Sequence, residues 1–183
     1  MRSKTPRIET NRLALRAYSP EDASNLSRLA GDFDVAKMTS SVPHPYPRLS
    51  AEGYIMLTEA GRALGKDMPF AIELPGEGLI GAAGFHARGE REWEFGYWVG
   101  KPFWGKGFAT EAARALLAWW DESMKVRCLS AARFVDNPAS GRVLEKVGFK
   151  PNGEVKERFS LARLAKIPSV EYVRCAESGA GGI

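Results

Sequence analysis

Apolar and polar positions along the chain alternate in a way that predicts short strands separated by helices. Strand-like alternation, or an apolar run of strand length, occurs at 13–17, 70–74, 79–86, 93–99, 128–135, 154–161 and 170–175. After residue 108 the apolar positions adopt helical spacing, in one stripe formed by Ala112, Ala113, Leu116, Leu117 and Trp120. Strands and helices mix without strict alternation, so the pattern predicts the α/β class with a mixed sheet and helices on both faces.

Capping residues and prolines predict where the earlier helices begin. Ser19 precedes a proline and two acids, which is typical of a helix start. Ser50 is expected to cap a second helix that ends near Leu64. Between them, residues 38–48 contain three prolines, and we expect this segment to be irregular.

Length and composition fit one globular domain. The chain has 183 residues, of which 44% are hydrophobic and 26% charged. We assign the domain to residues 1–175 and expect 176–183, which are mostly small residues, to form a flexible tail. No apolar run is long enough to span a bilayer, and the first residues lack the apolar core of a secretory signal. We therefore expect a cytoplasmic protein with no membrane attachment.

The cysteines, the histidines and the net charge limit which kinds of functional site we expect in this chain. Cys128 and Cys175 lie in strand-like runs, and we expect them to be buried free thiols in a reducing compartment. His44 and His86 have unlike neighbours and no cluster has metal-ligand spacing, so we expect no metal. The net charge of +4 comes without a dense Lys/Arg block, so we expect no direct nucleic-acid binding.

A glycine-bearing loop at 100–109 joins a predicted strand to the predicted helix. Such a loop can direct backbone N–H groups and the positive end of the helix at a phosphate. One alternative is a nucleotide P-loop, G-x-x-x-x-G-K followed by Ser or Thr, which Gly100, Gly105 and Lys106 fit. Gly107 then stands where a hydroxyl must hold magnesium, which disfavours nucleotide hydrolysis.

The same loop resembles the pyrophosphate loop of the GNAT acetyltransferases. That pattern has Gln or Arg, then Gly three positions later and Gly or Ala five positions later. Gly107 and Ala109 match, whereas Trp104 departs from it. Residues 137–149 resemble the family's second motif, Asn with Ser or Ala three positions on and a final Lys-x-Gly-Phe. With the family-like opening at 12–16, these motifs identify the chain as a member of the GNAT family. It is similar to the branch of RimJ and RimL, the ribosomal-protein N-terminal acetyltransferases, which often carries Trp in the loop.

The resemblance implies a fold, a co-substrate and a set of contacts. The GNAT acyl-CoA N-acyltransferase fold has a mostly antiparallel, twisted sheet splayed between its central strands, here 93–99 and 128–135. Acetyl-CoA is the implied co-substrate, with no metal. The cofactor-binding residues it implies are Tyr97, Trp98, Val99, Trp104, Gly105, Lys106, Gly107, Phe108, Ala109, Asn137, Ser140 and Arg142. Asn137 also has the type of a helix N-cap and Gly148 that of a C-cap, so structural roles stay open beside the implied ones.

Acetyl transfer needs a base for the amine, a donor to polarise the carbonyl and a proton for the leaving thiolate. Glu94 is the candidate base, with a surface ion pair as the alternative. Many relatives carry tyrosine where this chain has Leu144, so Ser140 is the candidate proton donor. Its alternative role is to satisfy the helix backbone. The amide of Val99 is expected to polarise the carbonyl.

The acceptor follows only from the resemblance. It implies a primary amine, most directly the α-amine of a protein N-terminus, attacked in a ternary complex with acetyl-CoA. A small-molecule amine, such as a polyamine or an antibiotic, is the alternative acceptor, and an acyl-CoA-binding sensor without turnover is the alternative function. We expect residues 38–48 to help form the acceptor pocket, with 43–47 as a rigid wall. The protein is expected to be a monomer or a homodimer.

Overall fold

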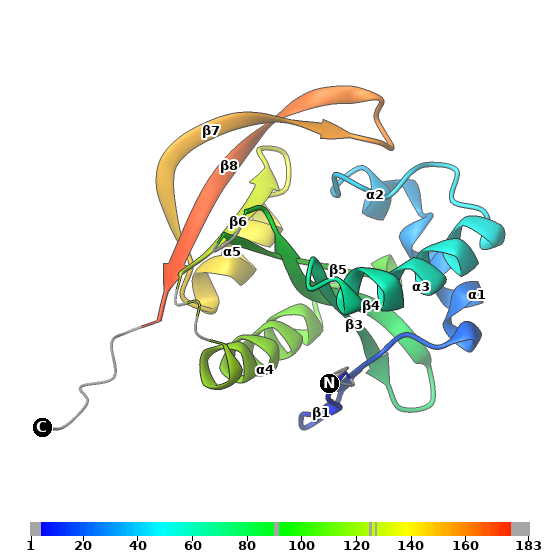
Figure 1. Ribbon diagram of the computed structural model, residues 1–183. Helices are drawn as coiled ribbons and strands as arrows, with labels where there is room; N and C mark the ends of the chain where they lie inside the picture. The colour runs from blue at the N-terminus through cyan, green and yellow to red at the C-terminus, as the bar shows by residue number, and fades with distance from the viewer. Residues whose placement is uncertain (1–4, 90–91, 125, 127, 177–183) are drawn as a thin grey trace, which may run out of the picture.

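The computed structural model describes residues 5–89, 92–124, 126 and 128–176, and Figure 1 shows their arrangement. The strands are β1 (Ile8–Glu9), β2 (Ala14–Arg16), β3 (Asp67–Leu74), β4 (Gly78–Ala87), β5 (Trp93–Val99), β6 (Cys128–Phe134), β7 (Lys150–Ser160) and β8 (Ala165–Cys175). The α-helices are α1 (Ala23–Ala30), α2 (Phe33–Ala36), α3 (Arg48–Ala63), α4 (Phe108–Ser123) and α5 (Pro138–Lys146), with 3-10 turns η1 (Pro20–Asp22) and η2 (Lys101–Phe103). Residues 177–183, most of the predicted tail, lie outside the described residues.

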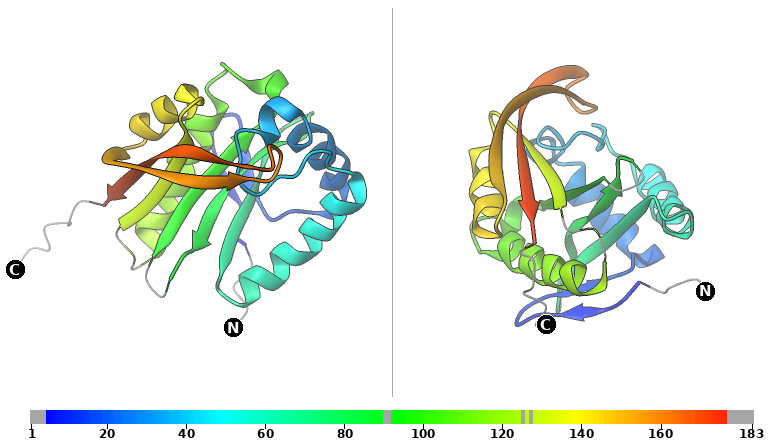
Figure 2. Two further views of the ribbon diagram at one scale, coloured as in Figure 1. Left: turned by 90° about the horizontal axis from the view of Figure 1, so that it is seen from above. Right: turned by 60° about the vertical axis from the view of Figure 1, so that its left-hand side comes forward.

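The strands form one mixed sheet in the order β1-β2-β3-β4-β5-β6-β8-β7. Neighbouring strands are antiparallel except β5 and β6, which run parallel. Helices α4 and α5 cover one face and α1 and α3 the other, as Figure 2 shows. The predicted class, a mostly antiparallel sheet with helices on both faces, is confirmed.

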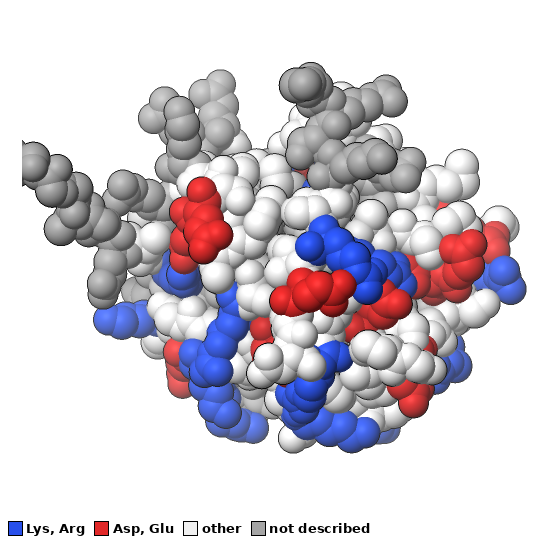
Figure 3. Space-filling model, turned by 90° about the horizontal axis from the view of Figure 1, so that it is seen from below, with Lys and Arg blue, Asp and Glu red and all other residues white. Residues whose placement is uncertain are grey.

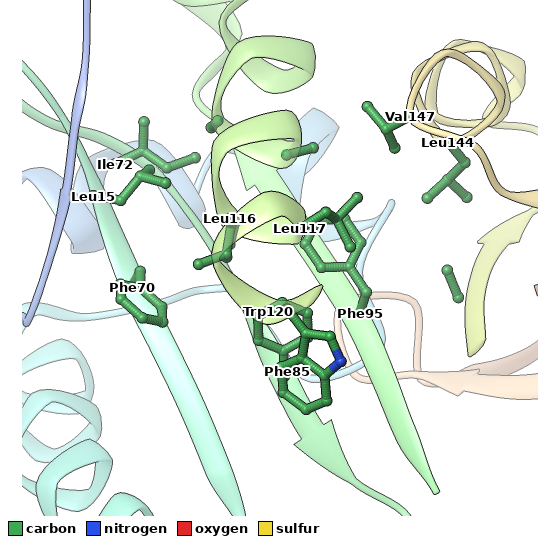
Figure 4. Packing of buried hydrophobic residues seen from close by; sticks show 14 of the residues in the cluster. Leu15, Phe70, Ile72, Phe85, Phe95, Leu116, Leu117, Trp120, Leu144 and Val147 are labelled. Carbon is green, nitrogen blue, oxygen red and sulfur yellow. The ribbon is translucent and has the colours of Figure 1, made fainter. Parts of the chain in front are cut away.

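A large apolar core joins the sheet to α4. The predicted stripe of α4 is buried as expected, and Trp120 stacks on Phe85 with ring centroids 4.0 Å apart. Figure 4 shows Trp120 beside Phe85, with Leu117 and Phe95 further along the same cluster. A second core lies under α1 and α3 on the opposite face. Both cores fix the backbone of β4 and β5, which carry the candidate site.

Two sequence expectations about element ends need correction. Helix α3 begins at Arg48 and not at Ser50, because the carbonyl of Pro47 accepts the amides of Ser50 and Ala51. Ser50 therefore lies in the first turn and is not the cap. Strands β7 and β8 are longer than predicted, since they pair with each other over most of their length.

The hairpin of β7 and β8 bends across the sheet and reaches the segment after α2 (Figure 1). At its tip the amide of Leu161 donates to the Ser40 carbonyl over 3.1 Å. Arg163 donates to the carbonyl of Lys37 over 2.8 Å and pairs with Asp136 over 2.8 Å. We call this bridge from the hairpin tip to residues 37–40 the arch.

The two cysteines differ from expectation. Cys128 and Cys175 are register partners on β6 and β8, both exposed, and they form a disulfide. The expectation of buried free thiols is wrong, because pairing of β6 with β8 brings together residues 47 positions apart. The expectation of a reducing compartment rested on free thiols, so it loses its basis. Among the described residues, no helix is long and apolar enough to span a membrane.

Candidate active site

The central strands β5 and β6 pair only at one end. Their register pairs are Trp93 with Leu129 and Glu94 with Ser130, beyond which the strands separate. We call the gap between β5 and β6 beyond these pairs the wedge. It closes near Glu94 and opens toward the loop that follows Val99. The splay implied by the family resemblance is therefore present.

The backbone of β5 presents polar groups to the wedge. Gly100 donates its amide to the carbonyl of Ile80 over 2.8 Å. Because hydrogen-bonded pairs alternate along an antiparallel ladder, the main chain of Trp98 faces β4 and that of Tyr97 and Val99 faces the wedge. The side chain of Trp98 packs against the second core. Of the three predicted strand contacts, Tyr97 and Val99 thus have main-chain groups directed into the wedge.

Residues 100–107 form a loop with the geometry of an anion site. Gly105 and Gly107 have φ of +74° and +80°, a region that residues with a Cβ avoid. Helix α4 begins directly after Gly107, and its first helical bond runs from the Glu111 amide to the Gly107 carbonyl over 3.0 Å. The amides of the three preceding residues, 108–110, therefore have no intrahelical partner and are free for an anion.

Arg12, from the turn between β1 and β2, and the loop's own Trp104 brace this loop. Arg12 donates to the Lys106 carbonyl over 3.0 Å and pairs with Glu111 over 2.6 Å, and its guanidinium lies 4.5 Å from the Phe108 ring centroid. The indole of Trp104 donates to the Val99 carbonyl over 2.6 Å. The motif that contains Arg12 was recognisable in the sequence, but the contact of Arg12 with the loop was not predicted. That contact depends on packing of residues 10–13 against α4.

Helix α5 lies on the other side of the wedge. The side-chain oxygen of Asn137 accepts the Ser140 amide over 3.2 Å, which confirms the predicted N-cap. The hydroxyls of Ser140 and Tyr97 lie 2.8 Å apart, so they bond across the wedge. Burial raises the pKa of Tyr97 to about 12, so this phenol keeps its proton at neutral pH. The protonated hydroxyl groups of Tyr97 and Ser140 therefore connect β5 to α5.

The rest of α5 is fixed by close packing. An ideal Cβ on Gly141 would lie 2.6 Å from Arg133 Nε and 2.8 Å from the Tyr172 hydroxyl, so a larger residue would displace these side chains. Leu144, where many relatives carry tyrosine, is buried in the core. Arg142 is exposed on the helix surface. Gly148 ends the helix with φ of +92°, as predicted.

Glu94 lies in a charged cluster on the face of the sheet opposite α4. It accepts hydrogen bonds from Arg88 over 3.0 Å and from Arg158 over 2.8 Å, and Arg158 also pairs with Glu171 over 2.6 Å. Burial tends to raise the pKa of Glu94, but the bonds to Arg88 and Arg158 outweigh it and the pKa is lowered. Such a carboxylate is a weaker proton acceptor than a free one. The sequence did not reveal the two arginines, because only the fold brings them to Glu94.

A small pocket lies beside this cluster, under the arch. Its lining residues are Met38, Ser40, Glu94, Ala132, Arg133, Phe134, Arg158 and Ser169. Met38 and Ser40 come from the 38–48 segment that was expected to form an acceptor pocket. The expected wall lies elsewhere, because His44 packs edge-on against Phe33 and Ser27 holds the Tyr46 carbonyl over 2.8 Å. The pocket adjoins the wedge through Glu94.

No group of three or more His, Cys, Asp or Glu with metal-site geometry occurs in the part of the chain that the structure describes. On the face drawn in Figure 3, acidic and basic side chains lie side by side.

The candidate site has three parts: a glycine loop suited to bind a phosphate, a wedge lined by strand amides, and a polar pocket. This combination defines a protein class that binds a long phosphorylated ligand along a split sheet.

Comparison with known proteins assigns the family. The model of the GNAT acetyltransferase domain matches residues 12–150. The uncharacterized N-acetyltransferase YoaA of Bacillus subtilis is 26% identical over 159 residues, which cover 83% of this chain and 87% of YoaA. RimJ of Mycobacterium smegmatis, solved with CoA-disulfide, has a TM-score of 0.83 and 23% identity, covering 97% of this chain and 91% of its own. RimL, described as a ribosomal L7/L12 α-N-protein acetyltransferase in complex with coenzyme A, has a TM-score of 0.81 and 18% identity, covering 94% and 99%.

The chain belongs to the GNAT acetyltransferase family. It is an N-acetyltransferase that uses acetyl-CoA as its co-substrate. The family assignment favours acetyl-CoA over a nucleotide as the phosphorylated ligand of this protein. The missing hydroxyl at Gly107 agrees with this, since coenzyme A needs no magnesium bridge at a backbone site.

Proposed function

We propose that this enzyme acetylates the α-amine of a protein N-terminus, by direct attack of the amine on acetyl-CoA in a ternary complex. The observation that carries the proposal is the wedge, which joins the phosphate loop at its open end to a polar pocket at its closed end. An arm laid along the wedge presents its far end to an acceptor in the pocket. The likeness of the fold to RimL and RimJ favours a protein N-terminus as that acceptor.

The proposed co-substrate contacts follow the wedge from its open end. The loop residues Trp104 to Ala109 receive the pyrophosphate, mainly through the amides that the start of α4 leaves free. The main chain of Tyr97 and Val99 pairs with the pantetheine arm, and Trp98 holds β5 against β4. On the α5 side, Asn137, Ser140 and Arg142 line the proposed path.

The chemistry then needs few groups. A terminal α-amine has a pKa of about 7.7–8.0, so about one in ten is already neutral at pH 7 and only modest base assistance is required. A wedge-facing amide of β5, that of Tyr97 or of Val99, polarises the acetyl carbonyl, and Ser140, with Tyr97 behind it, supplies a proton to the thiolate. Glu94 lines the pocket in which the acceptor amine is proposed to bind. Its role as the base stays a prediction, because two arginines already occupy its oxygens.

A side-by-side comparison of acceptor classes tests the proposal. Peptides with free N-termini and blocked lysines, polyamines and aminoglycosides are incubated separately with acetyl-CoA, and mass spectrometry detects acetylated products. Efficient acetylation of peptides at the N-terminal amine is the expected result. Turnover confined to polyamines or aminoglycosides would reject the N-terminal assignment while leaving the acetyltransferase intact.

A further inference from the structure

A histidine–aspartate pair lies on the same face of the sheet as Glu94. His86 of β4 and Asp67 of β3 are register partners, and His86 Nδ1 lies 2.7 Å from Asp67 Oδ1. An ionised carboxylate can only accept a hydrogen bond, so Nδ1 carries the proton in the neutral ring. Nε2 then presents its lone pair, as a proton acceptor requires.

The edge of this ring that carries Nε2 lies over Gly96, near the closed end of the wedge. An ideal Cβ on Gly96 would lie 3.8 Å from both Cδ2 and Nε2 of His86, so the ring lies over a residue with no side chain. Gly96 comes two positions after Glu94, the last residue of β5 that pairs with β6. The His86 side chain remains 37% exposed, so an amine or a water can reach it.

The neighbouring acid is less suited to take a proton. His86 and Glu94 are themselves register partners on β4 and β5. Glu94 is held by Arg88 and Arg158, whereas the edge of His86 that carries Nε2 lies over Gly96, which has no side chain. Among the described residues, charged groups on the two sides of His86 include Asp67 on one strand and the paired Glu94 and Arg88 on the other.

We propose that His86, oriented by Asp67, accepts the proton that the acceptor amine loses, either directly or through one water. This inference rests on the proposed amine acetylation and names its base. The protonated amine gives one proton to His86 Nε2, and its nitrogen then forms a bond to the acetyl carbon. The bond between the acetyl carbon and sulfur breaks, and the second amine proton passes to the thiolate by way of the hydroxyl groups. His86 releases its proton to solvent.

Steady-state kinetics of the intact protein tests the assignment, with acetyl-CoA and the acceptor peptide that the wild type uses best. His86→Gln keeps a polar side chain but no basic nitrogen. We expect kcat at pH 7 to fall by about tenfold, because about one α-amine in ten is already neutral there without a base. The melting-temperature increase caused by acetyl-CoA should be unchanged. Asp67→Asn should lower kcat less, because it disturbs only the orientation of the ring.

Chemical rescue separates catalysis from structure. In His86→Ala, added imidazole should restore several-fold of the lost rate without changing KM for acetyl-CoA. Glu154→Gln is the matched control, since it neutralises an exposed, ion-paired carboxylate on β7, outside the site. An unchanged kcat in His86→Gln, or a lost rate in His86→Ala that imidazole does not restore, would overturn the role of His86. Either result would leave the proposed acetylation itself standing. A wild type that acetylates no amine would instead reject the proposed function.

Discussion

Single residues set the geometry of the phosphate loop. Gly105 and Gly107 occupy left-handed backbone angles, where a Cβ costs roughly 1–2 kcal/mol. Gly107 also stands directly before the free amides of α4, where an anion has to approach closely. A side chain at Gly107 therefore strains the backbone and obstructs the ligand, two effects that a matched control can separate.

Gly107→Val should abolish most of the stabilisation by acetyl-CoA. At a hundredfold excess over its Kd, with a chelator present, acetyl-CoA should raise the wild-type Tm by roughly 5–10 °C. Gly76→Val is the control, because Gly76 has a similar φ of +85° in the β3–β4 turn. Differential scanning fluorimetry should show a full ligand shift in Gly76→Val and little in Gly107→Val. Equal shifts in the two variants would remove the loop from co-substrate binding.

Glu94 illustrates how neighbours change a residue's chemistry. Its bonds to Arg88 and Arg158 lower its pKa below the ordinary 4.5. The ionised form therefore stabilises the fold at pH values above 4.5, and this contribution is lost as the pH falls and the group takes up a proton.

Glu94→Gln should lower the Tm at pH 7 by roughly 4–8 °C, from a loss of about 2 kcal/mol in charge-assisted hydrogen bonding. Thermal melts from pH 7 down to pH 3 should show this difference shrinking below pH 4.5. Its kcat should fall less than that of His86→Gln. A Tm difference that does not vary with pH would mean that the ionised carboxylate contributes no stability.

At the scale of elements, α5 combines capping with a position beside the wedge. Asn137 caps the helix, Ser140 bonds to Tyr97 of β5, and Gly141 allows close packing on the sheet. One short helix thus fixes the distance across the wedge. Loss of its cap should loosen the site as well as the fold.

Asn137→Ala should cost about 1 kcal/mol of stability and lower the Tm by roughly 2–4 °C. If Asn137 also contacts the co-substrate, the Kd of acetyl-CoA should rise, as isothermal titration calorimetry can measure. Asp32→Ala is the control, since Asp32 caps α2 through the Asp34 amide over 2.8 Å. A normal acetyl-CoA Kd in Asn137→Ala would leave the residue with its capping role only.

At the scale of the whole molecule, the arch connects the β7–β8 hairpin, in the C-terminal part of the chain, to residues 37–40 in its N-terminal part. The hairpin of β7 and β8 belongs to the splayed half of the sheet, and residues 37–40 follow α2 on the other side. Contacts between them cover the pocket that contains Glu94. The cover of this pocket, the proposed acceptor side, therefore depends on an interaction between segments more than 100 residues apart.

Arg163→Ala removes the side chain that ties the hairpin tip to Lys37 and Asp136. We expect KM for the acceptor peptide to rise several-fold, while the Kd of acetyl-CoA stays unchanged because the loop and wedge are untouched. Lys156→Gln, an exposed change on the same hairpin, is the control and should leave both constants unchanged. A raised acetyl-CoA Kd with a normal acceptor KM in Arg163→Ala would contradict this division of the site.

The sequence by itself determined the parts of the site that depend on local rules. Alternating strands, the apolar stripe of α4, the glycine loop and the Asn137 cap all follow from contacts within a few residues of each other, and all are present. The start of α3 was missed because a backbone carbonyl, which carries no residue-type signal, supplies the first bonds.

Only the tertiary structure decided which side chains meet across strands. The pairing of Glu94 with two arginines, of His86 with Asp67, of Tyr97 with Ser140 and of the two cysteines joins residues that are distant in sequence or on different elements. Sheet register sets these contacts, and it depends on how the whole chain buries its apolar faces. Local pattern therefore predicted the glycine loop and the helix cap proposed to contact acetyl-CoA, whereas the proposed proton-transfer groups could be chosen only after the strands were aligned.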